Sequence, residues 1–285
     1  MVETVEMSEI RGLDIDKLVR GFALGEYNFI NECTVSSMSG DSVRWYQETA
    51  ADLTATSPSN LNVSPLSSFP TLEASWTRNT SYVSKYAAEG FLSMEDIKSA
   101  DIDVLSRTLL RLTRAVLKKR DQEIYSVMDG VTNTFATTAV GGDQWDATSG
   151  QDIIKDLLNA KRLIEVQDYS TSGATLLLNP YDYQSMVTWL ISAKGSSIPN
   201  FSSDKVSTGT VMTIVGLNVK VSNNVPDDEA LVIIPKVAVT WKSFADITSR
   251  AIEEPGIGTK LRVWCLGVPI LTDPYAGCRI TDTKT

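Results

Sequence analysis

The chain has 285 residues, 42% of them hydrophobic and 21% charged, a composition typical of a globular protein with a packed core. The formal net charge of -9 argues against a general nucleic-acid binder, because such binding depends largely on excess Lys and Arg that release counterions. The complete lack of histidine excludes Ser-His-Asp and Cys-His catalysis and every His-ligated metal site.

Few residues carry recognisable chemistry. The three cysteines, Cys33, Cys265 and Cys278, argue against a disulfide framework and are too few for an all-cysteine zinc site. The sequence contains neither a GxxxxGK[ST] phosphate loop nor a GxGxxG fingerprint. No apolar run of about 18 residues predicts a membrane span, and the acidic N-terminal residues do not resemble a signal peptide. We therefore expect no cofactor, no metal, no membrane partner and no enzymatic activity.

Two polar stretches are predicted to be turns. Asp227, Asp228 and Glu229 follow a proline and lack the alternating ligands of a calcium loop, so a solvated turn is favoured over a calcium site. The stretch "EPGIGTK" at 254–260 lacks the spacing that lets backbone amides surround a phosphate. It is predicted to be a Pro-Gly turn.

Along the chain, residues 1–40 show one short helical pattern and are predicted to be an arm. The pattern comprises Ile15, Leu18, Val19 and Phe22. The pattern then gives way to strand-forming residues at 42–50 and 69–86, joined by a polar stretch at 51–68. This arrangement predicts a long hairpin with a mobile tip, which must find its packing partner elsewhere because an isolated hairpin is marginally stable. A neighbouring subunit is the natural partner, and a disordered linker inside an ordinary domain is the alternative.

Aromatic and basic residues of the hairpin are the candidate subunit interface, because exposed aromatic patches usually mark interaction surfaces. The candidates are Arg44, Trp45, Tyr46, Trp76, Arg78 and Tyr82.

A long helix is predicted over 101–128, after a short helical turn that begins at Ser93. Its apolar residues recur in steps of three and four, and Gly130 stops it. A second, basic stripe lies beside the apolar one. This stripe is either an ordinary solvated face or a contact with acidic neighbours or packaged nucleic acid. Its residues are Arg107, Arg111, Arg114 and Lys118.

The remainder alternates between helices and strands. The patterns predict helices at 151–168 and 181–195, a buried strand at 174–180, three strands separated by turns over 210–235, and two closing strands. The predicted class is α+β.

This order of elements is one that a known family shares. Together with the stretches "YVSKYAAEGFLSMEDIKSADIDVLSRTLLRLTRAVLKKRDQEIYSVMDG", "ATLLLNPYDYQSM" and "VGLNVKVSNNVPDDEALVIIP", it resembles the major capsid proteins of tailed bacteriophages, with the Hong Kong 97-like capsid fold. The resemblance implies an N-terminal arm (1–40), an extended β-hairpin loop or E-loop (41–86), a P-domain with a long spine helix (87–172), an A-domain (173–235) and closing strands of both domains (236–285).

The same resemblance implies a structural protein that self-assembles in hexamers and pentamers into an icosahedral shell around a double-stranded DNA genome, which is bound without sequence specificity. The implied partners are a separate scaffolding protein, a portal and decoration proteins, and the implied location is the virion after assembly in the host cytoplasm. An encapsulin-like compartment shell remains an alternative. So does a soluble α+β enzyme that uses carboxylates, since the separation of a carboxylate pair is not readable from sequence.

Two features depart from the fullest form of the family. Only a short arm precedes the hairpin, so we expect that no cleaved scaffolding segment belongs to this chain. Residues 51–69 contain no Lys, and no Asn follows Asn224. We therefore expect no isopeptide crosslink of the kind that some members form between an extended-loop Lys and an Asn near the closing strands.

Overall fold

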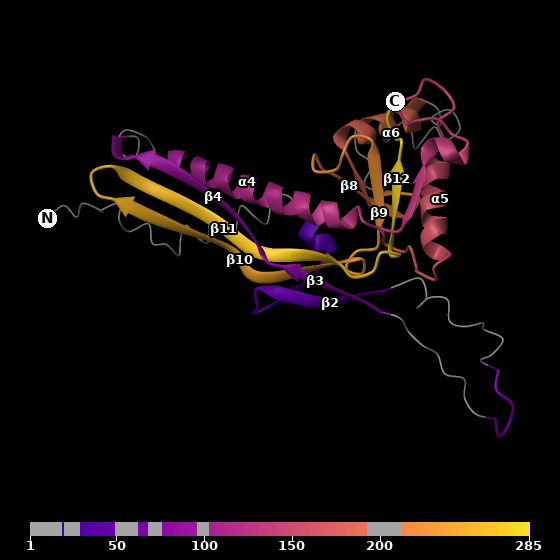
Figure 1. The fold of residues 1–285 in the computed structure, drawn as a ribbon. Helices are drawn as coiled ribbons and strands as arrows, with labels where there is room; N and C mark the ends of the chain where they lie inside the picture. The colour runs from indigo at the N-terminus through magenta and orange to yellow at the C-terminus, as the bar shows by residue number, and fades with distance from the viewer. Residues whose placement is uncertain (1–18, 20–28, 49–61, 68–75, 96–102, 193–212) are drawn as a thin grey trace.

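The computed structural model describes Val19 and residues 29–48, 62–67, 76–95, 103–192 and 213–285. These residues form an elongated lobe, in which one long helix lies along a narrow sheet, and a compact lobe, in which two helices pack on a second sheet (Figure 1). A separate hairpin lies beside the elongated lobe. The predicted α+β class is confirmed.

The sheet of the elongated lobe has the strand order β1-β10-β11-β4. Its centre is the antiparallel pair β10 (Val239–Glu254) and β11 (Gly258–Leu271), joined by the predicted Pro-Gly turn at residues 255–257. The edges are β4 (Ser84–Ser93), antiparallel to β11, and β1 (Thr34–Ser37), parallel to β10.

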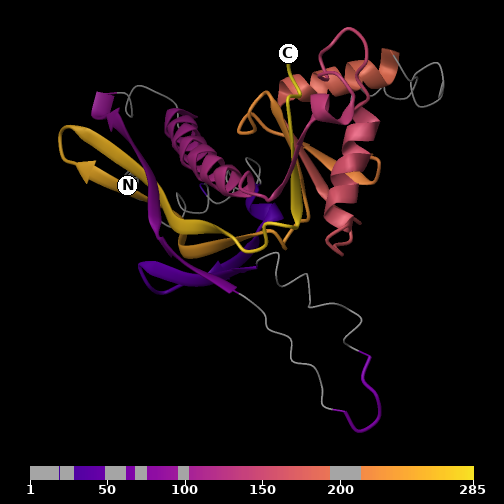
Figure 2. The ribbon, with the colours of Figure 1, turned by 45° about the vertical axis from the view of Figure 1, so that its right-hand side comes forward.

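The long helix α4 (Asp103–Met128) covers one face of this sheet and confirms the predicted spine (Figure 2). Its 26 residues span about 39 Å at 1.5 Å per residue. Gly90 of β4 permits close packing, because a Cβ there would lie 3.1 Å from a Leu112 methyl group and 3.3 Å from the Thr108 methyl group. The helix buries the apolar residues Leu109, Val116, Leu117, Ile124 and Met128.

The compact lobe contains a six-stranded sheet in the order β5-β12-β9-β6-β8-β7. The central strands β6 and β9 are almost completely buried, and the helices α5 and α6 confirm the two predicted helices. The strands are β5 (Asn133–Ala136), β6 (Thr175–Leu178), β7 (Thr213–Ile214), β8 (Leu217–Val221), β9 (Glu229–Ile233) and β12 (Gly277–Thr281), and the helices are α5 (Ile153–Glu165) and α6 (Pro180–Ser192).

The predicted hairpin strands exist as β2 (Ser42–Glu48) and β3 (Trp76–Tyr82), paired antiparallel with Ser42 opposite Tyr82. The predicted second strand, 69–86, covers parts of two strands, β3 and β4, which belong to different sheets. The chain leaves the hairpin at Val83, whose N–H donates to the Asp41 carbonyl, and then enters β4 of a different sheet. Alternation continues through this change, so the sequence pattern does not reveal it.

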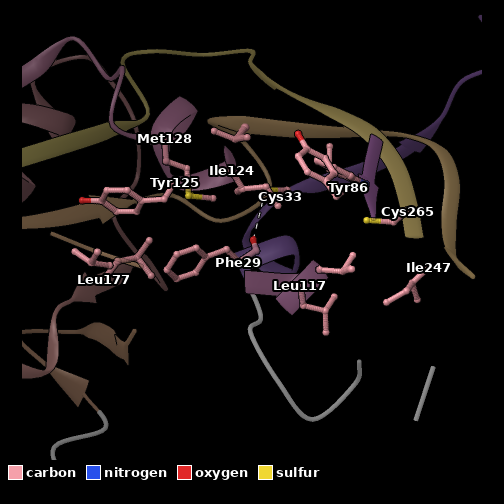
Figure 3. Packing of buried hydrophobic residues seen from close by; sticks show 14 of the residues in the cluster. Phe29, Cys33, Tyr86, Leu117, Ile124, Tyr125, Met128, Leu177, Ile247 and Cys265 are labelled. Carbon is pink, nitrogen blue, oxygen red and sulfur yellow. Dashed lines mark hydrogen bonds between the residues drawn. The ribbon is translucent and has the colours of Figure 1, made fainter. Parts of the chain in front are cut away.

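Several short elements were not predicted. They are the strands β1, β5 and β12 and the 3-10 helices η2 (Phe29–Glu32) and η4 (Thr137–Val140). Within the segment predicted to be an arm, residues 29–37 belong to the folded body, with Phe29 and Cys33 buried against α4 and its neighbours (Figure 3). The helical pattern at 15–22 lies outside the described residues, except for Val19, which is helical and buried. Most of the hairpin tip, 51–68, also lies outside them.

Polar contacts of buried Glu32 join the two lobes. Its carboxylate accepts a hydrogen bond from Thr175 of β6 at 2.8 Å and pairs with Lys220 of β8. Beside it, the rings of Phe29 and Tyr125 lie 6.1 Å apart, next to Leu177 of β6 (Figure 3). The N-terminal 3-10 helix therefore fixes the compact lobe against α4.

Candidate assembly surfaces

The β2–β3 hairpin has two chemically different faces, because side chains alternate across a strand. Val43, Trp45 and Gln47 of β2 are partly buried, whereas the residues between them are exposed. The cross-strand partners follow the same division, with Trp45 opposite Asn79 and Tyr46 opposite Arg78.

The inward face attaches the hairpin to its own subunit. Trp45 packs against the main core cluster, and its indole N–H donates to the Ser81 hydroxyl at 2.9 Å. On the same face, the Asn79 amide donates to Gln47 Oε1 at 3.2 Å. The hairpin therefore finds part of the packing partner that the sequence required of it in its own body, which partly covers the Trp45 indole, and not only in a neighbouring subunit.

The outward face carries the other described interface candidates. Tyr46 is 58% exposed and Tyr82 is 73% exposed, and Arg44 and Arg78 are exposed beside them. Two arginines and two tyrosines on one small β-ribbon can contact carboxylates and apolar surface together. Trp76 begins β3 opposite Glu48, and its side chain lies outside the described part of the molecule.

The basic stripe of α4 has the predicted geometry. Arg107, Arg111, Arg114 and Lys118 are all exposed, on the side of the helix that turns away from the core. Arg107 and Arg114 also make interactions within the subunit. The helix α4 and the β2–β3 hairpin lie on opposite sides of the β10–β11 ribbon (Figures 1 and 2).

A buried ion pair on the same helix escaped the sequence analysis. Arg120 and Asp121 are adjacent, and both lie in the core, with the guanidinium 3.4 Å from Asp121 Oδ1. The Asp121 carboxylate also accepts the Phe29 N–H at 3.4 Å. Burial raises the pKa of Asp121 to about 6, against the opposing effect of Arg120. The available signal was that the two charges fall where the apolar stripe of the helix continues between Val116 and Ile124.

A second charged cluster connects the end of α4 with the compact lobe. Arg279 of β12 pairs with Asp129 at 3.0 Å and approaches Glu229 of β9 at 3.7 Å. Tyr125 of α4 also lies within 3.5 Å of Glu229. Burial, followed by the charge of Asp129, raises the pKa of Glu229.

The cysteines and acidic residues in the described part of the chain form no cluster suited to metal binding. All three cysteines are free and buried, and burial raises the pKa of the Cys33 and Cys278 thiols to about 12. Among residues that the structure describes, no group of three or more acidic or cysteine side chains could hold a metal ion. No helix in that part of the chain is long and apolar enough to cross a membrane.

Comparison with known proteins assigns the family. A family model for phage capsid proteins matches residues 78–280, from the second hairpin strand to β12. The chain therefore belongs to the phage capsid protein family, as the resemblance noted from the sequence indicated, and it is a structural protein of the virion shell. Among curated proteins, no sequence relative is found.

Solved structures agree on the fold. The capsid of cyanophage P-SCSP1u is similar with a TM-score of 0.68 and 15% identity, over 90% of this chain and 88% of that one. Mycobacterium phage Che8 gives a TM-score of 0.65 and 14% identity, over 91% and 93%. A virus-like particle from Pyrococcus furiosus gives a TM-score of 0.61 and 9% identity, over 94% and 98%. At these identities the likeness establishes the fold, and the Hong Kong 97-like capsid fold predicted from the sequence is confirmed.

Proposed function

We propose that many copies of this chain assemble, as hexamers and pentamers, into an icosahedral shell that encloses a double-stranded DNA genome. The observation that carries the proposal is the outward face of the β2–β3 hairpin, where two arginines and two tyrosines are exposed on a ribbon already fixed to its own body. A small ribbon needs no such surface for its own folding. Many weak contacts of this kind, repeated in each copy, are sufficient to close a shell.

In this proposal the β2–β3 hairpin is the extended loop, and the elongated lobe with α4 is the P-domain. The compact lobe is the A-domain. Because α5 packs on β12 and β5, we place both β5 and α5 in the A-domain rather than ending the P-domain at residue 172. The closing strands then divide, with β10 and β11 in the P-domain and β12 in the A-domain.

The hairpin is proposed to tether neighbouring subunits through its outward face. Rings of identical subunits use heterologous contacts, so this face meets a different region of the next copy. Reversing both charges in the double variant Arg44→Glu/Arg78→Glu should leave a folded, soluble subunit that forms no closed particles. Negative-stain microscopy and sedimentation measure assembly, and circular dichroism of the unassembled subunit measures folding.

The matched control is Arg44→Lys/Arg78→Lys, which keeps the charge and changes only the shape of the cation. We expect closed particles from this control. Closed particles of normal size from the Glu variant would show that the outward face plays no part in assembly.

The basic stripe of α4 is proposed to contact a neighbouring subunit or the packaged DNA. The four cations share one exposed helix face, and salt-dependent contact with phosphates requires no sequence readout. Replacing Arg107, Arg111, Arg114 and Lys118 together by Gln should reduce either the yield of shells or their DNA content. Unchanged shells with unchanged DNA would leave the stripe as a solvated face.

Further partners and the site of assembly follow from the same proposal. A separate scaffolding protein, a portal and decoration proteins are the expected partners, assembly takes place in the host cytoplasm, and the chain has no catalytic activity. An encapsulin-like compartment is less favoured, because the matching family is that of phage capsid proteins. Purified shells that hold an enzyme cargo instead of DNA would favour the compartment.

A further inference from the structure

The C-terminal segment, residues 282–285, lies at one end of the compact lobe and is held there by hydrogen bonds (Figure 1). The Thr137 hydroxyl donates to the Asp282 carbonyl at 2.5 Å, and the Trp145 N–H donates to the Thr283 carbonyl at 2.9 Å. The segment thereby connects η4 and the loop before α5, which are far from it in sequence.

Lys284 is the cation of this segment, and it lies among acidic and aromatic groups. Its ammonium lies 2.5 Å from Asp227 Oδ2 and 4.8 Å from the centre of the Tyr181 ring. Its backbone N–H donates to Asp228 Oδ1 at 3.0 Å. The next residue, Thr285, donates to Asp146 Oδ1 through both its N–H and its hydroxyl.

A buried carboxyl lies under the segment without a compensating bond. Asp182, in the first turn of α6, is fully buried, and neither of its oxygens has a hydrogen-bond partner. The buried Thr283 hydroxyl is likewise unpaired. A carboxylate in this position is removed from bulk solvent and has no donor within hydrogen-bond geometry, so its charged form is disfavoured.

The groups that face Asp182 come from every element packed around it. Burial raises its pKa to about 7, the nearby Thr283 hydroxyl opposes the rise although its geometry falls short of a hydrogen bond, and the charges of Asp227, Asp228 and Asp146 add to it. Four carboxyl groups thus surround a segment whose side chains provide one cation, Lys284. Tyr181 completes the group by donating to Asp146 at 3.1 Å.

We propose that residues 282–285 form a pH-sensitive latch, held closed while the Asp182 carboxyl is neutral and loosened when it ionises beside its three acidic neighbours. A neutral carboxyl can donate to Thr283 and leaves Lys284 to balance the exposed aspartates. An ionised one adds an uncompensated buried charge directly beneath the segment.

The sign of the pH response follows from the direction of each pKa shift. Because the pKa of Asp182 is raised in the latched state, its contribution is fully present below its usual value of 3.8 and is lost as pH rises to about 7. The pKa of Asp227 is lowered by its bond to Lys284. For Asp146, burial acts upward, but hydrogen bonds from Thr285 and Tyr181 lower the pKa. The contributions of Asp227 and Asp146 are therefore lost on acidification, so the latch is tightest at about pH 4 and weakens steadily as pH rises from there to about 7.

Hydrogen–deuterium exchange of the full chain tests the latch, with rates corrected for the intrinsic effect of pH. The backbone N–H groups of Lys284 and Thr285 report directly, because both donate to loop carboxylates. Their protection factors should fall about tenfold or more between pH 5 and pH 8, the loss expected when a carboxyl pKa differs by more than one unit between the two states. In Asp182→Asn, which keeps the shape and never ionises, they should change less than about twofold over that range.

The matched control is Asp121→Asn, which neutralises a buried carboxyl of the other lobe and should leave the pH response of the segment intact. At each pH the protection of Lys284 and Thr285 must stay below that of the α4 amides around buried Leu117, since equal protection would mean that the segment opens only by global unfolding and would overturn the latch. Equal pH responses in the wild type and in Asp182→Asn would overturn it as well. If that variant does not fold, constant protection in the wild type from pH 5 to pH 8 gives the same negative answer.

Discussion

The two sheets of the molecule differ in how completely they are covered. In the compact lobe, Leu176 and Leu178 of β6 point into the cluster with α5 and α6, while Leu177 between them joins the cluster with α4. Both faces of that sheet are therefore core. In the elongated lobe, α4 covers one face only, and on the other face Phe91 is 47% exposed and Lys85 lies 6.0 Å over the half-buried Trp264 ring.

This difference in coverage distinguishes a sheet that stabilises the fold of one chain from a sheet that can still contact other molecules. A sheet buried on both faces has satisfied its apolar residues within one chain, so its sequence is constrained by packing. A sheet with one open, partly apolar face keeps surface available for contacts with other molecules. In the proposed shell, neighbouring subunits would cover the open face of the elongated lobe, in addition to the outward face of the hairpin.

The largest expected effect comes from truncating the covered sheet. Leu177→Ala removes a fully buried side chain between β6 and α4 and should lower the free energy of unfolding by about 2–5 kcal/mol. Phe91→Ala, on the open face, should change it by less than about 1 kcal/mol. Urea denaturation of the unassembled subunit measures both. If the two variants lose equal stability, the open face is already core and the comparison is wrong.

The strong periodic elements could be predicted from the sequence, whereas the partners of short strands could not. The steps of three and four in α4 and the alternation in β2 define helix and strand from neighbouring residues alone. The four- and five-residue strands β1, β5 and β12 depend on pairing with strands far along the chain. The same limit explains why the split of 69–86 into β3 and β4 was missed.

The sequence predicted which residues form the candidate surfaces, but it predicted only partly which way their side chains point. All four cations of the α4 stripe are exposed, because helical spacing fixes the face that they share. Trp45 turned inward because the hairpin packs on the body, a contact that composition does not contain. Arg120 and Asp121 are buried because residues 29–33 fold back over α4, and Asp182 is buried beneath a segment a hundred residues later.

The smallest expected effect concerns the ion pair on the open face, between Arg262 of β11 and Glu89 of β4. Both side chains are nearly half exposed, so water screens their attraction. A double-mutant cycle with Arg262→Ala and Glu89→Ala should give a coupling free energy of about 0.2–1 kcal/mol in the unassembled subunit, decreasing as salt is added.

If neighbouring subunits cover this face in the shell, the same pair should matter more there, because removing water strengthens the attraction and shields it from salt. The single variant Arg262→Ala should then weaken assembled particles more than it weakens the free subunit, as measured by urea dissociation of each. A coupling above about 2 kcal/mol in the free subunit would instead mean that the pair is already desolvated before assembly. In that case the elongated sheet would be closed on both faces like the compact one, and the division between a folding sheet and an assembly sheet would not hold.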